Sequence, residues 1–245
     1  MEYLPNIFFA LALALGFGFF AMNIRRLSRN IKLGKDAHRK DKKQERFKNM
    51  MMIAFGQSKM VKRPFSGLLH IIVYLGFVII NIEVLEIIID GLFGTHRVFK
   101  GVLGNGFYGF LIGTFEILAA LVFVAVVIFW LRRNVSNIKR FLSKEMKGWP
   151  KNDGNIILYF EMVLMTLFLV MNASDLPFQQ VGIGNPISQL IVPLFDGFSS
   201  ESIHIIERTA WWSHILGILV FLNYLYYSKH LHILLAFPNT YFANL

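Results

Sequence analysis

The stretch that decides the fold is WWSHILGILVFLNYLYYSKHLHILLAF, from Trp211 to Phe237. It is apolar and long enough for a membrane helix, since about twenty predominantly apolar residues span a hydrocarbon core of about 30 Å. His214 and His232 are eighteen residues apart, which is five whole helical turns, so both imidazoles leave the same side of one continuous helix. At roughly 1.5 Å per residue they are expected about 27 Å apart, one near each membrane face. His230 is expected to face elsewhere, about 160° away.

The composition of the chain predicts an integral membrane protein. Its 245 residues are 55% hydrophobic and include no cysteine, and its mean hydropathy is +0.52. The absence of thiols excludes disulfides, cysteine-bound iron–sulfur clusters and covalently attached c-type haem within this sequence, so any haem here is held non-covalently. The first apolar run has no preceding Lys or Arg, and we therefore expect a retained helix rather than a signal peptide.

Apolar runs of membrane-spanning length recur along the chain and predict an all-α bundle of five transmembrane helices. The expected spans are 4–23, 65–92, 107–131, 155–172 and 209–235. No internal repeat is visible, and the odd number of spans disfavours a duplicated small-solute transporter.

Basic residues are concentrated in two of the expected loops. Segment 25–63 contains fourteen Lys and Arg against three acids, and seven more basic residues lie between 132 and 151, whereas 175–208 has one basic residue and four acids. Because Lys and Arg are enriched in cytoplasmic loops, we expect a multi-pass protein of the cell's inner membrane with its N-terminus outside and its C-terminus in the cytoplasm. The net charge of +10 is then a topology signal, and no nucleic-acid partner is expected because no binding module accompanies it.

Segment 25–63, the expected cytoplasmic loop, is also suited to anionic lipid headgroups or to an acidic partner. Its densest basic run consists of Arg39, Lys40, Lys42, Lys43 and Arg46. On the opposite side, the expected outer loop 175–208 is broken repeatedly by Gly and Pro, and its apolar stretch 187–195 is too short to span a membrane. Either a short interfacial helix or an ordinary covering loop fits that stretch.

His70 is the candidate partner of His232. It lies a few residues inside the cytoplasmic boundary of the second span, and the second and fifth spans run antiparallel. The two histidines are therefore expected at the same depth, as ligation of one haem b iron by two imidazoles requires. His214 has no histidine across from it in the second span, where Asn81 shares the face of His70, so a second haem is left open. Histidines in such segments can also simply hydrogen-bond to neighbouring helices.

Four carboxylates lie in apolar segments, where charge is costly and usually faces a bundle interior or water. They are Glu83, Glu86, Glu116 and Glu161. Glu83 and Glu86 are three residues apart on one helix face near the outer side, which makes them the candidates for proton transfer beside a quinone or quinol. The alternative for each carboxylate is a structural hydrogen bond to a neighbouring helix.

Several of these residues carry a resemblance to a known family. Trp212-Ser213-His214, the run from Ser228 to His232, and His70 are similar to the cytochrome b membrane subunit of the group formed by the respiratory nitrate reductase gamma subunit and heterodisulfide reductase. The resemblance implies two b haems stacked between spans two and five. It assigns His70 and His232 as iron ligands of the cytoplasmic-side haem and His214 as one ligand of the outer haem, whose second histidine has no counterpart here.

The family resemblance also implies a function. The expected protein moves electrons between a membrane quinone pool and a cytoplasmic, cysteine-rich iron–sulfur partner through haem b, as a subunit of a quinone-linked oxidoreductase complex. Because this sequence has no cysteine, the clusters must belong to a separate subunit or to a further part of a longer protein. The alternative is a haem-free anchor or assembly subunit of a respiratory complex.

Overall fold

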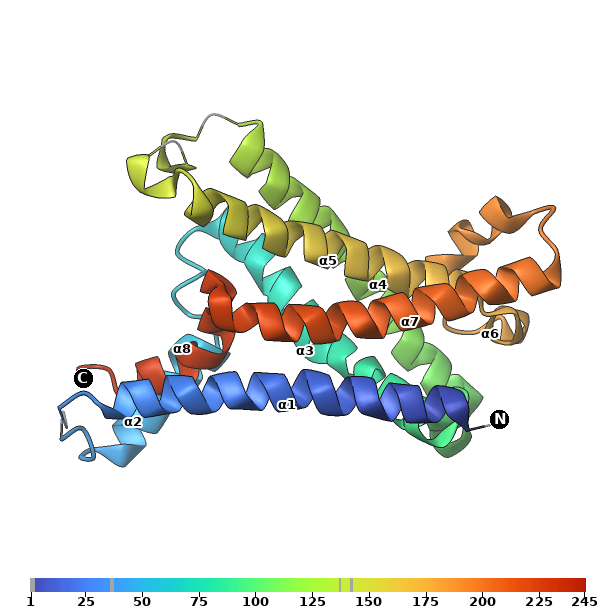
Figure 1. Cartoon of the computed structure of the whole chain (residues 1–245). Helices are drawn as coiled ribbons and strands as arrows, with labels where there is room; N and C mark the ends of the chain where they lie inside the picture. The colour runs from blue at the N-terminus through green and yellow to red at the C-terminus, as the bar shows by residue number, and fades with distance from the viewer. Residues whose placement is uncertain (1–2, 36–37, 137, 142) are drawn as a thin grey trace.

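In the computed structural model, five long helices cross one another in an all-α bundle (Figure 1). The structure describes residues 3–35, 38–136, 138–141 and 143–245, and no strand occurs in these ranges. The long helices are α1 (Leu4–Lys32), α3 (Pro64–Phe93), α4 (Val98–Asn134), α5 (Trp149–Ser174) and α7 (Ser200–Tyr224). Each is long and apolar enough to cross a membrane, which confirms the prediction of an all-α membrane protein with five spans.

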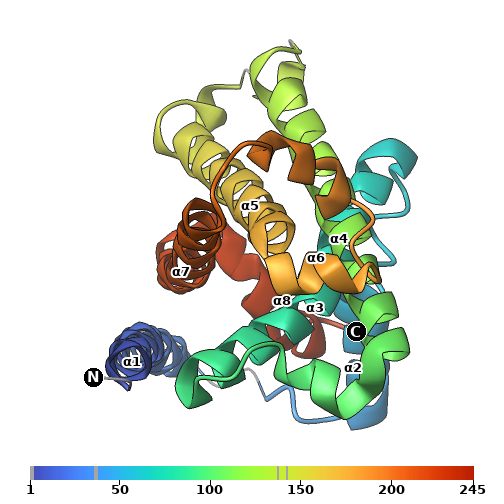
Figure 2. The ribbon, with the colours of Figure 1, turned by 90° about the vertical axis from the view of Figure 1, so that its right-hand side faces the viewer.

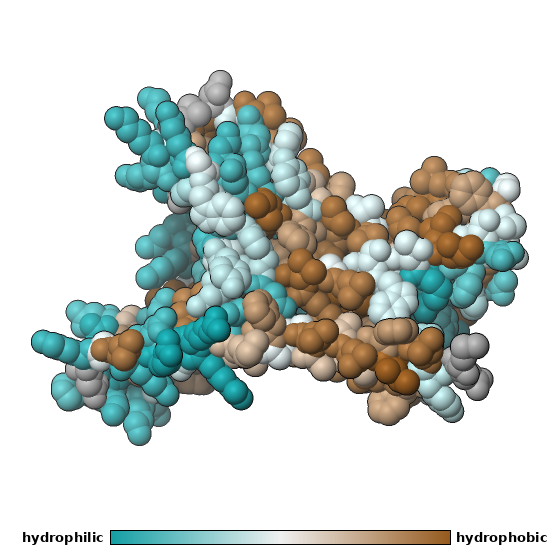
Figure 3. Space-filling model, viewed as in Figure 1, coloured by the Kyte–Doolittle hydropathy of each residue, from teal (hydrophilic) through white to brown (hydrophobic). Residues whose placement is uncertain are grey.

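The two ends of the bundle differ in charge and in the short elements they carry. One end, called here the basic end, holds α2 (Lys43–Met50), a π-helical turn at Met51–Phe55 and α8 (His232–Tyr241). The other, called the N-terminal end, holds the N-terminus, the 94–97 connector and α6 (Leu176–Val181). Figure 3 shows hydrophilic residues gathered at the basic end and hydrophobic residues over the middle of the bundle.

The long helices form a closed ring of contacts. The neighbouring pairs are α1–α3, α3–α4, α4–α5, α5–α7 and α7–α1, as the view along the bundle shows (Figure 2). Close helix approach is made by small residues: a Cβ added at Gly76 would overlap Val122 of α4, and one at Gly91 would overlap the ring of Phe9 on α1. In this ring α3 and α7, which carry His70 and His214, are separated by α1 on one side and by α4 and α5 on the other.

The fifth helix differs from the prediction. It begins at Ser200 rather than near 209, and the expected continuous helix through His232 is wrong. α7 ends at Tyr224, Ser228 is extended with φ −105° and ψ 153°, and a new helix, α8, begins at His232. Asp153 of α5 fixes this break, because its carboxylate accepts hydrogen bonds from the Tyr224 hydroxyl at 2.6 Å and the Lys229 backbone N–H at 3.1 Å. The helical wheel therefore does not extend to His230 or His232.

The long loop at the N-terminal end contains short helical elements. α6 is followed by two 3-10 turns, Ser188–Leu190 and Val192–Phe195, in which Leu190 and Leu194 are exposed. The apolar stretch 187–195 thus forms two short 3-10 helices, and α6 adds a short α-helix before it. The location of these elements at a membrane surface stays a prediction.

The basic run in segment 25–63 is only partly available to a partner; residues 36–37 of the segment lie outside the described residues. Arg46 is buried and donates to the backbone carbonyls of Ala243 at 2.8 Å and Tyr241 at 3.4 Å, and to Asp41 at 2.8 Å. Arg39 donates to the carbonyl of Phe242 at 2.5 Å. Arg46 of α2 and Arg39, which precedes α2, thus join this segment to the end of α8 and the residues after it, so Arg46 is not available to a docking partner.

The orientation of the bundle in the membrane is a prediction that rests on the basic loops. A reporter fused after Leu245 is expected on the cytoplasmic side, and one inserted between Gly182 and Pro186 on the opposite side. The measurement is the accessibility of each reporter in intact cells. The reversed pattern would overturn the assignment of the basic end to the cytoplasm.

Candidate functional site

Three histidines meet at the basic end. The rings of His70 on α3 and His232 on α8 have centroids 6.5 Å apart and planes inclined by 46°. His230, which was expected to face elsewhere, lies 5.4 Å from the ring of His232 and 3.8 Å from the Glu161 carboxylate of α5. The break at Ser228 causes this difference, because it turns His230 back toward the bundle.

The spacing of His70 and His232 fits two imidazoles that share one iron. Two rings each bonded at about 2 Å to one metal ion have centres about 6 Å apart. The Nδ1 atom of His232 lies 3.2 Å from the carbonyl of Lys229, an arrangement that holds a ligating imidazole in one tautomer and leaves Nε2 for the metal. In the described residues, the buried Nδ1 atom of His70 has no hydrogen-bond partner. The positions of His70 and His232 are therefore compatible with both residues binding the iron of one haem b.

His214 has different surroundings. It is buried, its Nδ1 lies 3.0 Å from the Leu164 carbonyl of α5, and its ring packs on Phe168 at 6.1 Å between centroids. No histidine ring contacts it in the part of the chain that the structure describes. Asn81 on α3, which was expected to share the face of His70, is exposed and bonds to the Phe77 carbonyl of its own helix. No second histidine therefore accompanies His214 among the described residues, and its role as a haem ligand stays a prediction.

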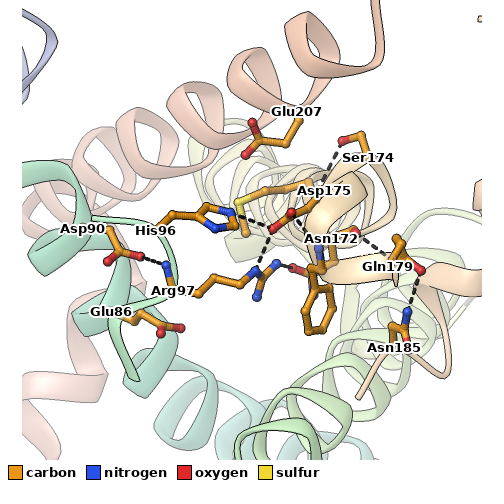
Figure 4. A network of polar contacts seen from close by, with 12 residues as sticks. Glu86, Asp90, His96, Arg97, Asn172, Ser174, Asp175, Gln179, Asn185 and Glu207 are labelled. Atoms are coloured by element: carbon orange, nitrogen blue, oxygen red, sulfur yellow. Dashed lines mark hydrogen bonds and ion pairs between the residues drawn. The ribbon is translucent and has the colours of Figure 1, made fainter. Parts of the chain in front are cut away.

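A buried polar network occupies the N-terminal end, centred on Arg97 (Figure 4). The Arg97 guanidinium donates to Asp175 at 2.7 Å, to Asn172 at 2.9 Å and to the Tyr108 hydroxyl at 3.2 Å, and it lies 3.9 Å from the centre of the Phe178 ring. Burial raises the pKa of the Asp175 carboxyl, but the His96 hydrogen bond and the Arg97 charge together bring this pKa well below its usual value. Asp175 is therefore an anion paired with a cation at the ends of two spans.

The connector between α3 and α4 is held in place by Asp90. Its carboxylate accepts hydrogen bonds from the Thr95 hydroxyl at 2.5 Å and from the backbone N–H groups of Arg97 at 2.7 Å and Val98 at 3.2 Å, so it caps the start of α4. Arg97 has φ 53°, a left-handed conformation that is costly for a residue with a side chain and persists where the surroundings fix it. The left-handed backbone of Arg97, fixed by the Asp90 cap, places the Arg97 side chain inside the bundle.

Beside this network lies a pocket of about 190 Å³. The residues around it come from α1, α3, the connector, the end of α5 and α7; they include Phe9, Glu83, Glu86, Asp90, His96, Arg97, Asp175, Glu207, Trp211 and Trp212. Ligand pockets usually measure about 300 to 1,000 Å³, so this volume suits a single ring headgroup rather than a large molecule. The expected carboxylate pair, Glu83 and Glu86, is thus brought together at one pocket.

The two carboxylates of the pair differ in their hydrogen bonds. Glu86 accepts from the Tyr108 hydroxyl at 2.9 Å and from the Phe99 backbone N–H at 2.8 Å. Glu83 is 3% exposed, and its buried Oε2 atom has no hydrogen-bond partner among the described residues. Glu83 therefore keeps an unpaired carboxylate oxygen at the pocket, whereas both oxygens of Glu86 hold α4 against α3.

Glu116 and Glu161, the other two membrane carboxylates, have separate roles. Glu116 accepts from the Asn172 amide at 3.0 Å and from the backbone N–H groups of Ile187 and Ser188 at 2.9 and 3.0 Å, so it ties the loop after α6 to the core. Glu161 lies near His230 at the basic end. Glu116 therefore makes structural hydrogen bonds to neighbouring segments, which was the alternative to a role in proton transfer.

Sequence reasoning did not identify His96, Arg97, Asp175, Tyr108 or Asn172 as site residues. The sequence held one sign of this network. His96 and Arg97 follow the second span and Asp175 follows the fourth, so isolated charges of opposite sign are expected at the same side of the membrane. Their direct pairing across 78 residues was not visible in any local pattern.

Comparison with known proteins adds two relatives. The chain is 28% identical over 214 residues to the probable iron-sulfur-binding oxidoreductase FadF of Bacillus subtilis, a match that covers 86% of this chain and 29% of FadF. It is 21% identical over 222 residues to the EtfAB:quinone oxidoreductase of Syntrophomonas wolfei, again covering 86% of this chain and 29% of that protein. No family model and no solved structure matches the chain.

The chain thus spans 29% of the length of either relative. The relatives' names agree with the oxidoreductase, iron–sulfur and quinone parts of the resemblance found in the sequence. Neither name mentions cytochrome b or nitrate reductase, so the more specific assignment to the nitrate reductase gamma group stays a prediction.

Proposed function

We propose that this chain is a membrane electron-transfer module that exchanges electrons between a quinone pool and an iron–sulfur partner through haem b. The observation that carries the proposal is the approach of His70 and His232 to 6.5 Å between ring centroids. The pocket that contains Glu83 at the opposite end and the names of the two relatives support it. Haem b, if bound between His70 and His232, would supply a one-electron carrier at the basic end.

In this proposal each end of the bundle has its own task. His70 and His232 hold the iron at the basic end. Glu83 accepts a proton from a quinol, or donates one to a quinone, in the pocket at the N-terminal end, because quinone chemistry couples two electrons to two protons. The exposed Lys43 and Lys48 of α2 present positive charge to an acidic iron–sulfur partner on the cytoplasmic side and steer its docking.

The test uses the protein purified with its partner subunits and inserted into liposomes. Addition of a quinol should reduce a membrane-impermeant one-electron dye added on the side of the basic end. Glu83→Gln, which retains the shape of the side chain, should slow this transfer roughly 10- to 100-fold, because proton transfer by a positioned group contributes about that much or more. Failure of quinol to reduce the dye through the wild-type protein would overturn the proposal.

One observation favours a second function, that of a haem-free membrane anchor. His214 packs on Phe168 of α5, and no second histidine contacts it among the described residues, so one of the three candidate ligands lacks the partner that a bis-histidine site needs. A histidine that only joins helices needs no iron. Under this alternative the purified protein contains no haem and still assembles with its partner subunits.

A further inference from the structure

His96 and Asp175 form a dyad at the pocket that neither the expected site nor the relatives' names assign. The Nε2 atom of His96 lies 3.1 Å from Oδ2 of Asp175, the same oxygen that accepts the Arg97 Nε–H at 2.7 Å. The Oδ1 atom of Asp175 accepts the Phe178 N–H at 3.1 Å. Both carboxylate oxygens are therefore engaged, and the side chain is fixed in position (Figure 4).

The hydrogen bond to Asp175 determines which nitrogen of His96 is available. Asp175 is an anion, as the pairing with Arg97 and its lowered pKa indicate. A carboxylate that accepts from Nε2–H holds the neutral imidazole in one tautomer, with a free lone pair on Nδ1 that can take a proton. The His96 side chain is 51% exposed, so such a proton can pass on to water.

His96 and Glu83 provide two different proton acceptors at one pocket. Both residues line it, His96 from the connector and Glu83 from α3. The Oε2 atom of Glu83 is buried without a partner, whereas His96 is open to solvent. Oxidation of a quinol to a quinone releases two protons, so a pocket with two acceptors matches the number of protons released.

We propose that His96 is a catalytic residue of the quinone site, positioned by Asp175 and Arg97, and that it takes one quinol proton while Glu83 takes the other. This inference rests on the proposed function. In the balanced step, both O–H bonds of the quinol break, one proton goes to Nδ1 of His96 and one to Oε2 of Glu83. The two electrons leave one at a time to a one-electron acceptor, a chemistry that haem b would supply if held by His70 and His232. Quinone reduction is the reverse step.

The test uses His96→Ala in the protein purified with its partners and cofactors. Binding is measured first, with a tail-less dimethyl naphthoquinone as the probe. Trp211 and Trp212 line the pocket, so bound quinone quenches their fluorescence, and this readout needs neither haem nor turnover. We expect the dissociation constant of His96→Ala to stay within about threefold of the wild type, because removal of one exposed side chain costs little binding energy.

Quinol oxidation is measured next. We expect His96→Ala to be roughly 100-fold slower than the wild type, and added imidazole to restore a measurable part of the rate, because free imidazole replaces the missing proton acceptor. Asp175→Asn should also be slower, and imidazole should not restore it. His204→Ala is the matched control: its side chain is exposed and lies outside the pocket, so its rate should equal that of the wild type.

Three results with His96→Ala would overturn the role of His96, and one result with the wild type would overturn the proposed function. A His96→Ala variant that oxidises quinol at the wild-type rate overturns the proposal. So does a slow variant that imidazole fails to restore, or one that has lost quinone binding, because a structural role explains both results. If the wild-type protein itself does not oxidise quinol, then the proposed function fails, which is a different outcome from failure of His96 alone.

Discussion

His70→Ala and His232→Ala are each expected to remove haem b from the purified protein. The two rings lie on separate elements, α3 and α8, at the spacing that one shared iron requires. Loss of either imidazole leaves five-coordinate haem on the other, and such haem is weakly held. The measurement is the haem content per chain together with the reduced-minus-oxidised absorption spectrum of each variant.

Two other histidines provide controls for this prediction. His204→Ala should retain the haem, because that side chain is exposed on α7 at the opposite end of the bundle. His230→Ala should retain the haem but shift its spectrum, since the His230 ring lies 5.4 Å from that of His232. Full haem content in both His70→Ala and His232→Ala would show that these residues are not the ligands.

Arg97→Leu is expected to destabilise the protein by about 3 to 5 kcal/mol, the usual cost of removing one partner from a buried ion pair. Asp175, which is 4% exposed, would lose its cation, and Asn172 and Tyr108 would each lose a donor. The measurement is thermal unfolding in mild detergent. Arg29→Leu, at the exposed end of α1, is the control and should change the stability by no more than about 0.5 kcal/mol. An equal effect of both changes would contradict the account.

The same ion pair predicts how stability depends on pH. The pKa of Asp175 is lower in the folded protein than in the unfolded chain, so its contribution is fully present above the unfolded pKa of about 3.9. It is lost progressively as the pH falls below that value and through the folded pKa. The unfolding temperature of the wild type should therefore fall more steeply on acidification than that of Asp175→Asn. If the unfolding temperatures of the wild type and Asp175→Asn fall in parallel as the pH is lowered, Asp175 makes no pH-dependent contribution to stability.

The membrane helices follow directly from hydropathy, because each span must bury about twenty apolar residues in lipid whatever its neighbours do. His70 and His232 meet at one end of the bundle, as the antiparallel course of α3 and α7 predicts, although His232 lies on α8, beyond the break in the fifth helix. The prediction for His230 failed for a local reason: Ser228 and Asp153 break the helix. The polar run Ser228-Lys229-His230 lies at the break, but the contact with Asp153 on another helix is not visible in the local sequence.

The polar network around Arg97 at the N-terminal end could not be predicted from the sequence. Glu83 and Glu86 could be named because carboxylates in apolar segments are conspicuous. The choice between them depends on contacts with other helices: Tyr108 and Phe99 bond to Glu86, whereas the Oε2 atom of Glu83 has no partner among the described residues. Such contacts between separate helices depend on tertiary packing, which the spacing of residues along one chain does not encode.

The central claim is that this chain holds haem b between His70 and His232 and reduces it with quinol. The most direct measurement is the reduced-minus-oxidised absorption spectrum of the wild-type protein, purified gently with its partners, with quinol as the reductant. The account predicts a b-type haem signal that quinol produces and that is absent from His70→Ala. A wild-type protein without haem would contradict the account and favour the membrane anchor.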